Sequence, residues 1–228
     1  MTTLVIATRN AHKIGEIRAI LGDAFCYATL KDFPDAPEVI EDANTFAGNA
    51  TKKAVALARW LSRIRNLEPG TENIFVLGDD SGLEVDALNG APGVHSARFT
   101  ALDSGRPGNS PDAENNAKLL RLLAPVPVEK RTARFCCVIA LTPVLSDRVE
   151  SASSVCYADE FELQSQLFDG ACEGRIQFAA SGQGGFGYDP LFVPHGFSQS
   201  FAELGEAVKN KLSHRARALA KLKTTLAV

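Results

Sequence analysis

Two adjacent carboxylates are the residues whose type and position most directly suggest chemistry in this chain. Asp79 and Asp80 follow the apolar run 73–78 and precede Ser81 and Gly82. The run predicts a buried strand, so we expect the carboxylates where that strand passes into a loop. Because a turn needs only one Asp and a Gly, the second carboxylate favours a site for a hard cation. Ordinary turn chemistry remains the alternative.

A second polar group lies between an apolar strand at 4–7 and a helix signalled by apolar residues at 14, 17 and 21. Its six residues are Thr8, Arg9, Asn10, Ala11, His12 and Lys13. A strand-to-helix turn directs backbone N–H groups and the helix dipole at an anion, and Lys13 adds a positive charge. The turn lacks the P-loop pattern, and simple helix capping is the alternative interpretation.

Two further charges accompany the second predicted helix, which begins at an N-cap on Asn44 or Thr45 and continues to about residue 65. Lys53 falls on the packed side of that helix, where an ammonium needs a partner, and a phosphate would serve. Glu41 precedes the helix. It is either a second metal carboxylate or a partner of the helix dipole.

The segment 182–187 matches the dinucleotide pattern G-x-G-x-x-G, but a β-rich run with two prolines follows it at 188–194. The pattern requires a helix there, so a dinucleotide-binding fold is excluded. A glycine loop that ends in Phe186 and Tyr188 remains. These rings either stack on a base or fill the core.

A basic group near the C-terminus combines Lys209 with His214 and Arg215, and Ser213 is a candidate N-cap for the last helix. Side chains at a positive helix end can read a phosphate or a carbonyl oxygen. The alternative is a solvated basic helix with a capping serine.

The spacing of the apolar residues predicts the strands and helices that position these groups. The predicted strands are 4–7, 73–78, an edge-like 83–88, 134–141, 154–161 and 175–180. Besides the first two helices, helices are predicted at 110–125, 202–209 and 213–226, and 101–109 is predicted as a loop. No repeat or long linker divides the chain, so we expect one domain over 1–228.

The composition excludes several classes of protein. The chain has 228 residues, 45% of them hydrophobic, and a net charge of -3, so it is globular and poorly suited to hold nucleic acid. Its longest apolar stretch, 135–145, is too short to cross a membrane, and no signal peptide is recognisable, which predicts a cytoplasmic protein. Five cysteines without a Cys-x-x-Cys pair disfavour structural zinc.

Taken in order, these motifs resemble those of the non-canonical purine nucleoside triphosphate pyrophosphatases, the inosine/xanthosine triphosphate pyrophosphatases. The matching pieces run nearly end to end: Thr8-x-Asn10-x-x-Lys13, Glu41, Thr45-Phe46-x-x-Asn49-Ala50-x-x-Lys53, 79–83, 91–98, 184–190 and 213–215. Two features depart from the family pattern. Gly48 stands where the family usually has a glutamate, and 59–73 is longer than usual.

The resemblance implies an α/β fold in which a long mixed central sheet joins two α/β lobes with the active cleft between them. It also implies a homodimer, and hydrolysis of a purine nucleoside triphosphate to the monophosphate and pyrophosphate with Mg²⁺. Asp80 and Glu41 would then hold the metal, and Asp80 would orient or deprotonate the attacking water.

The other candidate residues fall into two groups, those that would bind the triphosphate and those that would bind the base. By resemblance, Lys13, Lys53 and Lys209 neutralise the triphosphate, and Thr8, Asn10 and Ser81 orient it. A 6-keto purine has an acceptor at position 6 and a donor at position 1, whereas adenine reverses both. Asp189 would accept from the keto form. His214, Arg215 and the backbone amides near Phe186 and Gly187 would donate to its 6-oxygen, beside Tyr188.

Two rival functions stay open. One is a pyrophosphatase for modified pyrimidine or methylated nucleotides that uses the same phosphate machinery. The other is a nucleotide sensor without turnover, for which Asp80→Asn would leave binding and function alike.

Overall fold

The computed structural model describes residues 1–65, 73–145 and 160–226. The chain divides into two compact units. Unit 1 consists of Met1–Asp80, Val138–Phe168 and Lys221–Val228, and unit 2 of Ser81–Cys137 and Asp169–Ala220. Among the described residues, no helix has both the length and the apolar character needed to cross a lipid bilayer.

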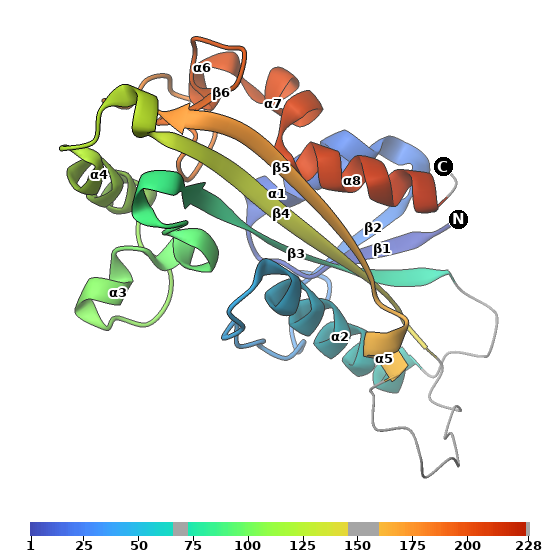
Figure 1. Ribbon diagram of the computed structural model, residues 1–228. Coiled ribbons are helices and arrows are strands. Elements are labelled where there is room, and N and C mark those ends of the chain that lie inside the picture. The colour runs from blue at the N-terminus through green and yellow to red at the C-terminus, as the bar shows by residue number, and fades with distance from the viewer. Residues whose placement is uncertain (66–72, 146–159, 227–228) are drawn as a thin grey trace. The chain divides into compact units, whose positions relative to one another are not determined.

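The strands form one sheet in the order β2-β1-β3-β4-β5-β6 (Figure 1). Strand β1 (Thr3–Ile6) is parallel to both β2 (Cys26–Thr29) and β3 (Ile74–Val85). Strand β5 (Gln166–Ile176) is antiparallel to β6 (Phe192–Pro194), and β4 (Thr132–Pro143) lies between β3 and β5. The expected mixed-sheet α/β fold is therefore confirmed.

Unit 1 opens with β1, the helix α1 (Ala11–Leu21) and β2, followed by α2 (Phe46–Arg65) and the first part of β3. The short helix α5 (Glu160–Leu163) also belongs to this unit. A capping hydrogen bond from Gly48 N–H to Thr45 Oγ1, 3.0 Å long, starts α2 and confirms Thr45 as its N-cap. The core includes Trp60, whose ring meets Phe33 edge to face at 6.0 Å.

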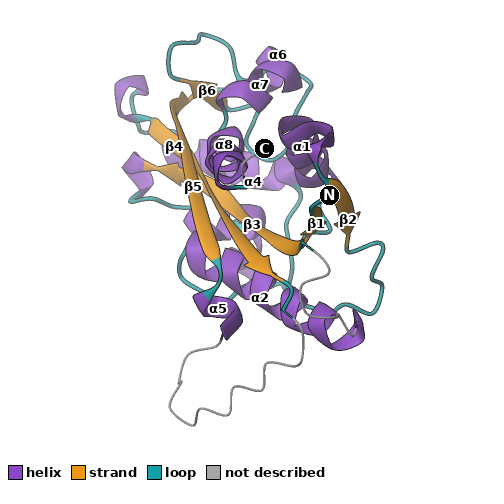
Figure 2. Cartoon of the chain, turned by 90° about the vertical axis from the view of Figure 1, so that its right-hand side faces the viewer, coloured by secondary structure: helices purple, strands orange, loops and turns teal. Residues whose placement is uncertain are grey.

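Helix α2 lies directly on β3 because the strand has a glycine at the crossing point (Figure 2). A Cβ atom at Gly78 would approach Ala50 O to 2.3 Å. Only a residue without a side chain fits there, and the next two residues of the strand are Asp79 and Asp80.

Unit 2 contains the helices that follow β3, except α5. They are the 3-10 turns Asp86–Leu88, Gly93–Arg98 and Val128–Lys130, α3 (Ala101–Ser104), α4 (Asp112–Leu123), α6 (Phe201–Leu204), α7 (Glu206–Leu212) and α8 (His214–Thr225), of which α8 ends in unit 1. A further 3-10 turn, Gly22–Ala24, lies in unit 1. The core of unit 2 is aromatic. The ring of Phe135 packs 4.7 Å from Phe192 and 6.1 Å from Phe201.

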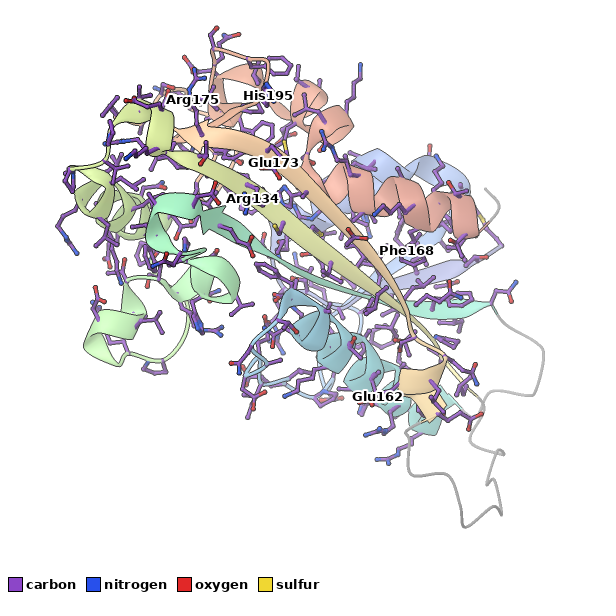
Figure 3. All side chains as sticks on the ribbon, viewed as in Figure 1. Arg134, Glu162, Phe168, Glu173, Arg175 and His195 are labelled. Atoms are coloured by element: carbon purple, nitrogen blue, oxygen red, sulfur yellow. The ribbon has the colours of Figure 1, made fainter. Side chains whose placement is uncertain are left out.

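A polar network links neighbouring strands of unit 2. Arg134 on β4 forms ion pairs with Asp86 at 3.0 Å and with Glu173 on β5 at 3.2 Å, and it lies 3.7 Å from Glu84 on β3 (Figure 3). Cross-strand pairs of opposite charge stabilise a sheet and fix its register.

The structure corrects the predicted path around the carboxylates. Residues 73–78 and 83–88 are not two strands with a loop between them, because β3 runs without interruption from Ile74 to Val85. Asp79 and Asp80 therefore sit in mid-strand and are only 1% and 6% exposed. The expectation of a surface turn was wrong, since buried partners replace water around both carboxylates.

Other predicted boundaries moved as well. The strand predicted at 175–180 was mostly wrong, because β5 runs from Gln166 to Ile176 and residues 177–180 are not in a strand. Most of the predicted strand 154–161 and part of the long 59–73 segment lie outside the described residues, and Glu160 and Phe161 are helical. Gly205 divides the predicted helix 202–209 into α6 and α7. Strand β2 and helix α3 were missed because each spans only four residues.

Candidate active site

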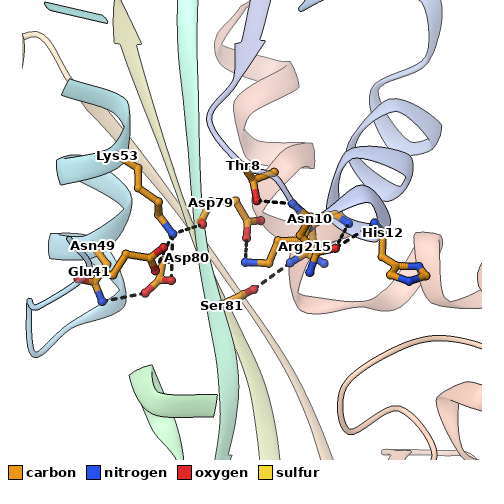
Figure 4. A network of polar contacts seen from close by, with 11 residues as sticks. Thr8, Asn10, His12, Glu41, Asn49, Lys53, Asp79, Asp80, Ser81 and Arg215 are labelled. Atoms are coloured by element: carbon orange, nitrogen blue, oxygen red, sulfur yellow. Dashed lines mark hydrogen bonds and ion pairs between the residues drawn. The ribbon is translucent and has the colours of Figure 1, made fainter. Parts of the chain in front are cut away.

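The ammonium of Lys53 is the centre of a buried polar cluster in unit 1 (Figure 4). Its Nζ lies 3.1 Å from Glu41 Oε2 and 3.2 Å from Asp80 Oδ1, and it donates to the Asp79 carbonyl oxygen at 2.6 Å. Helix α2 supplies the lysine, β3 the aspartates, and the segment before α2 the glutamate. The predicted pair of carboxylates, Glu41 and Asp80, therefore lies around one positive charge.

Asn49 holds the other oxygen of Asp80. Its Nδ2 donates to Asp80 Oδ2 at 3.2 Å and to Ala43 O at 3.3 Å, while its Oδ1 accepts from Ala43 N–H at 3.0 Å. Asn49 and Lys53 are four residues apart, so both project from one face of α2. The sequence placed Asn49 in a matching motif without a role, and its helical spacing to Lys53 was the available signal.

Asp79 pairs with the N-terminal turn. Lys13 Nζ lies 2.5 Å from Asp79 Oδ1, and the aspartate side chain is fully buried. The two neighbouring aspartates thus use different lysines, and three carboxylates share two ammonium groups. Their environment is an arrangement of opposite charges in a low-dielectric interior.

Burial raises the pKa of Asp80 above its ordinary value, although Lys53 and Lys13 act in the opposite direction. The pKa of Lys53 is also raised, because Asp80, Glu41 and Asp79 together outweigh the burial that lowers it. One lysine is surrounded by several acids, whereas each acid also has another acid nearby. Burial is thus the main cause of the raised pKa of Asp80, with a smaller contribution from Glu41, whereas the neighbouring carboxylates cause the raised pKa of Lys53.

The turn 8–13 is capped as an ordinary helix start. Asn10 Oδ1 accepts from His12 N–H at 2.9 Å and from Lys13 N–H at 3.2 Å, while Asn10 N–H donates to Thr8 Oγ1 at 3.2 Å. Arg9, Ala11 and His12 are exposed. The capping that was the alternative interpretation is present, so an anion at this turn would have to share those amides with Asn10 or displace it.

The donors around Lys53 fit a magnesium ion, although they form no closed cage. Among the residues that the structure describes, no group of three or more His, Cys, Asp and Glu side chains is arranged to hold a metal. Two carboxylates within 3.2 Å of one nitrogen can share one small cation. Magnesium commonly takes one or two protein carboxylates and completes its shell with water and phosphate oxygens.

In unit 2, Asp189 and Lys209 form a buried ion pair beneath the glycine loop. Lys209 Nζ lies 2.5 Å from Asp189 Oδ2 and 4.4 Å from the centroid of the Phe186 ring. The same Asp189 oxygen accepts from Phe186 N–H at 2.9 Å. In this arrangement, that oxygen holds the loop. The contacts through Oδ2 leave the acceptor role predicted for Asp189 as a prediction, since a carboxylate has two oxygens and several lone pairs.

The next amide is also engaged, since Gly187 N–H donates to Asp112 Oδ2 at 2.6 Å. The two backbone amides predicted to meet a 6-oxygen therefore both donate to carboxylates. Tyr188 is 3% exposed and its hydroxyl donates to Ser96 O at 2.9 Å, so its ring belongs to the core. Burial raises the pKa of Tyr188. Phe186 is half-buried and remains the candidate for stacking on a base.

The last helix begins as predicted. Ala216 N–H donates to Ser213 Oγ at 3.2 Å, which confirms Ser213 as the N-cap of α8. The His214 ring stacks on Phe135 at 4.9 Å, and Arg215 donates to Ser81 Oγ at 2.8 Å. Arg215 and His214 are 0% and 4% exposed, so neither belongs to a solvated basic face.

Gly48 explains one departure from the family pattern. A Cβ atom there would lie 2.8 Å from the Ala43 Cβ. Ala43 belongs to the segment that carries Glu41 and is held by Asn49. A larger residue would therefore shift the segment that carries Glu41.

The comparisons with known proteins agree with these motifs. The family model described as the Ham1 family matches residues 4–225. The chain belongs to the Ham1 family. The resemblance drawn from the motifs is thereby confirmed, and Ham1 relatives cover the chain nearly end to end.

Two curated relatives carry the same description. A dITP/XTP pyrophosphatase of Shouchella clausii (strain KSM-K16) is 43% identical over 226 residues, covering 99% of this chain and 97% of its own. A dITP/XTP pyrophosphatase of Geobacter sulfurreducens (strain ATCC 51573 / DSM 12127 / PCA) is 45% identical over 227 residues, covering 99% and 97%.

Solved structures of Ham1 proteins have the same fold. A HAM1 protein from Coxiella burnetii matches with a TM-score of 0.75 at 33% identity, covering 100% of this chain and 99% of its own. The Ham1 protein of Staphylococcus aureus matches with a TM-score of 0.72 at 31% identity, covering 99% and 98%.

Proposed function

We propose that this chain is a nucleoside triphosphate pyrophosphohydrolase that converts dITP, ITP and XTP to the monophosphate and pyrophosphate with Mg²⁺. The observation that carries the proposal is the environment of Asp80 in mid-strand. Lys53 and Asn49 each contact one of its oxygens, at 3.2 Å in both cases. A buried carboxylate with a raised pKa, fixed at both oxygens, is typical of a catalytic base rather than of a structural residue.

In this proposal Asp80 orients the attacking water and takes its proton. Asn49 and Lys53 prevent the carboxylate from rotating, so the water approaches in one direction. Lys53 and Lys13 bring positive charge to unit 1, where it would balance charge on the departing pyrophosphate. Thr8 and Asn10 shape the adjacent turn.

Glu41 and Asp80 would hold the magnesium ion, as predicted from the resemblance. When bound, the ion would neutralise phosphate oxygens and polarise the phosphorus to be attacked. Lys53 contacts both carboxylates. It therefore holds the two carboxylates close together whether or not the cation is present.

Unit 2 carries the groups that we assign to the base. Phe186 offers a half-buried ring backed by the Lys209 ammonium, and His214 and Arg215 remain the candidate donors to a 6-oxygen. Adenine has an amino group at that position and would place donor against donor. Asp189 holds the loop through Oδ2, and it stays our candidate acceptor for the N–H at position 1 of a 6-keto purine. Ser81 follows the two aspartates in the sequence, and its hydroxyl accepts a hydrogen bond from Arg215. It therefore stays in the proposal.

The remaining expectations are proposals of the same kind. We infer a homodimer in the cytoplasm, and the cleft between two lobes of one domain over 1–228 stays a prediction. Light scattering coupled to size-exclusion chromatography tests the dimer. A mass of 24.4 kDa, that of one chain, would contradict it.

The deciding experiment measures pyrophosphate release from dITP, ITP, XTP, GTP and dATP, each with Mg²⁺ and with excess chelator. We expect release from dITP, ITP and XTP, little from dATP, and loss of activity on chelation. Equal rates on dITP and dATP would remove the base preference, and a faster rate on a modified pyrimidine would favour that rival function.

Asp80→Asn separates hydrolysis from mere binding. We expect pyrophosphate release to fall by about 100-fold or more, since a general base contributes on that order. Binding of dITP, measured by calorimetry, should persist because the lysines remain. Unchanged turnover in this variant would favour a different base.

A further inference from the structure

Helix α4 holds both sides of one glycine in the loop of unit 2. Asp112, the first residue of the helix, accepts from Gly187 N–H at 2.6 Å. One turn later, Asn116 Nδ2 donates to the Gly187 carbonyl oxygen at 3.0 Å. The two side chains are four residues apart and therefore share a face of the helix. One accepts and the other donates, which matches the two backbone groups they meet.

This pairing fixes a residue that has little conformational preference of its own. Gly187 has a φ of +62°, in the left-handed region that glycine adopts without steric cost. Its N–H and its C=O belong to successive planar peptide groups. Holding both groups sets the φ and ψ angles of Gly187. These angles in turn set how Phe186 and Tyr188, on either side of it, are oriented.

The neighbouring contacts complete the arrangement. Phe186 N–H donates to Asp189, and Tyr188 is held through its hydroxyl by Ser96. Three consecutive residues are thus each fixed, Phe186 by a side chain of the same loop and the other two by groups from other segments of unit 2. Phe186 is the member of the three whose ring stays half-buried.

The Asn116 side chain is oriented by this bond and by little else. Its Oδ1 is buried and has no hydrogen-bond partner among the described residues. A buried amide oxygen without a donor is unfavourable, so the orientation is retained for what the amide nitrogen does. The hydrogen bond from its amide nitrogen is therefore the contact through which Asn116 acts on Gly187.

We propose that Asp112 and Asn116 are positioning residues that set the affinity of the enzyme for the base through Gly187 and Phe186. The proposal rests on the proposed function and deepens it. Neither residue contacts the carboxylate cluster of unit 1 in any interaction described above. Their loss should therefore weaken base recognition while the hydrolytic step is retained.

The test compares Asn116→Ala, Asp112→Ala and Asp112→Asn with the matched control Glu114→Ala. Glu114 lies in the same first turn, is exposed, and carries the same charge as Asp112. We expect both alanine variants to raise the KM for dITP by about three- to tenfold, the loss of one hydrogen bond, with kcat changed less than about twofold. Asp112→Asn keeps an acceptor and should recover most of the affinity. Glu114→Ala should match the wild type.

Inorganic tripolyphosphate provides a probe without a base. As a competitive inhibitor it should bind the wild type and the alanine variants equally. A parallel loss of tripolyphosphate and dITP affinity would overturn the proposal, because it would indicate general damage to the site. An unchanged KM for dITP in both alanine variants would overturn it as well.

Amide hydrogen exchange tests the same residues without any substrate. The Gly187 amide should be protected in the wild type and in Glu114→Ala, and should exchange at least about tenfold faster in Asp112→Ala. Equal exchange in all variants would contradict the positioning role. If the wild type hydrolysed none of the triphosphates, the proposed function would fail, and this exchange result alone would decide whether Asp112 holds the loop.

Discussion

Lys53 is the shared donor of two buried groups and of one partly exposed carboxylate. Its ammonium contacts Glu41, Asp80 and the Asp79 carbonyl. A single substitution therefore leaves two acids and one carbonyl without their shared donor. Such a site is costly for stability, which is typical of residues kept for function.

Lys53→Met should lower pyrophosphate release from dITP by about 100-fold, the usual effect of removing one charged group that stabilises a transition state. The melting temperature should also fall, because buried carboxylates lose their counter-charge. Steady-state kinetics and circular dichroism measure the two effects. Lys52→Met is the matched control: Lys52 is an exposed neighbour that pairs with exposed Asp42, and its loss should change the rate by less than about twofold.

Asp80→Asn should stabilise the protein at neutral pH. Since burial raises the pKa of Asp80, the folded state binds its proton more tightly than the unfolded state. Stability therefore falls as the pH rises from the unfolded pKa to the folded pKa, and the full penalty persists at pH 7. Removing the charge should raise the melting temperature by about 2–4 °C at pH 7.

The gain should disappear below about pH 4, where Asp80 is protonated in both states of the wild type. Calorimetric scans of both proteins across this range provide the measurement. A variant that is less stable than the wild type at pH 7 would show that the lysines outweigh burial at this carboxylate.

At the scale of elements, two of the helices that carry site residues rest on a strand at a glycine. Helix α2 crosses β3 at Gly78, and α8 approaches β5 at Gly170, where a Cβ atom would lie 2.2 Å from His214 O. The close approach brings Lys53 and Asn49 to Asp80 in one unit, and sets the start of α8 in the other.

Gly78→Ala should therefore move α2 and separate Lys53 from Asp80. We expect a loss of about 1–3 kcal/mol in the free energy of unfolding, as for other overpacked cores, with a marked loss of activity. Gly15→Ala is the opposite case. No atom lies within 4 Å of its added methyl, and removing a glycine from the interior of α1 should stabilise the protein by about 0.5–1 kcal/mol. Urea titrations measure both changes.

Local signals in the sequence predicted the caps at Thr45 and Ser213 and the existence of the long helices, because a cap involves residues a few positions apart. The course of β3 could not be predicted in this way. Two aspartates in mid-strand resemble a turn until Lys13, Lys53 and Asn49 are known to surround them. These partners lie 26 or more positions away in the chain, so no local pattern contains them.

The same limit applied to the base loop. The glycine pattern excluded a dinucleotide fold and indicated Phe186. The sequence could not show that Asp189 and Asp112 accept hydrogen bonds from the backbone amides of the loop. Asp112 lies 75 positions before Gly187. Family resemblance indicated the candidate residues, whereas their hydrogen-bond partners required coordinates.

At the scale of the whole molecule, neither unit is a continuous segment. The chain passes from one unit to the other after Asp80, Cys137, Phe168 and Ala220. Unit 1 needs residues such as Ala140 and Val144 to complete the core formed by β1 and α2. Segments far apart in sequence must therefore come together before either core is closed.

A fragment of residues 1–80 should consequently remain unfolded. It contains most of the helices of unit 1 but lacks the part of the core that β4 supplies, and we expect its circular dichroism to show little helix and no cooperative melting. Adding the fragment 81–228 should restore structure if the two pieces associate. A fragment 1–80 that melts cooperatively alone would contradict this view.

Trp60 is a fluorescent probe of one unit and not of the other. It is the only tryptophan of the chain, and its indole lies against Phe33 in the core of unit 1. Tryptophan fluorescence, excited at the red edge of the protein absorption band, therefore follows the melting of that core. It does not report on the phenylalanine cluster around Phe135. Agreement between this signal and a probe of backbone ellipticity would reveal whether both halves of the enzyme come apart as one.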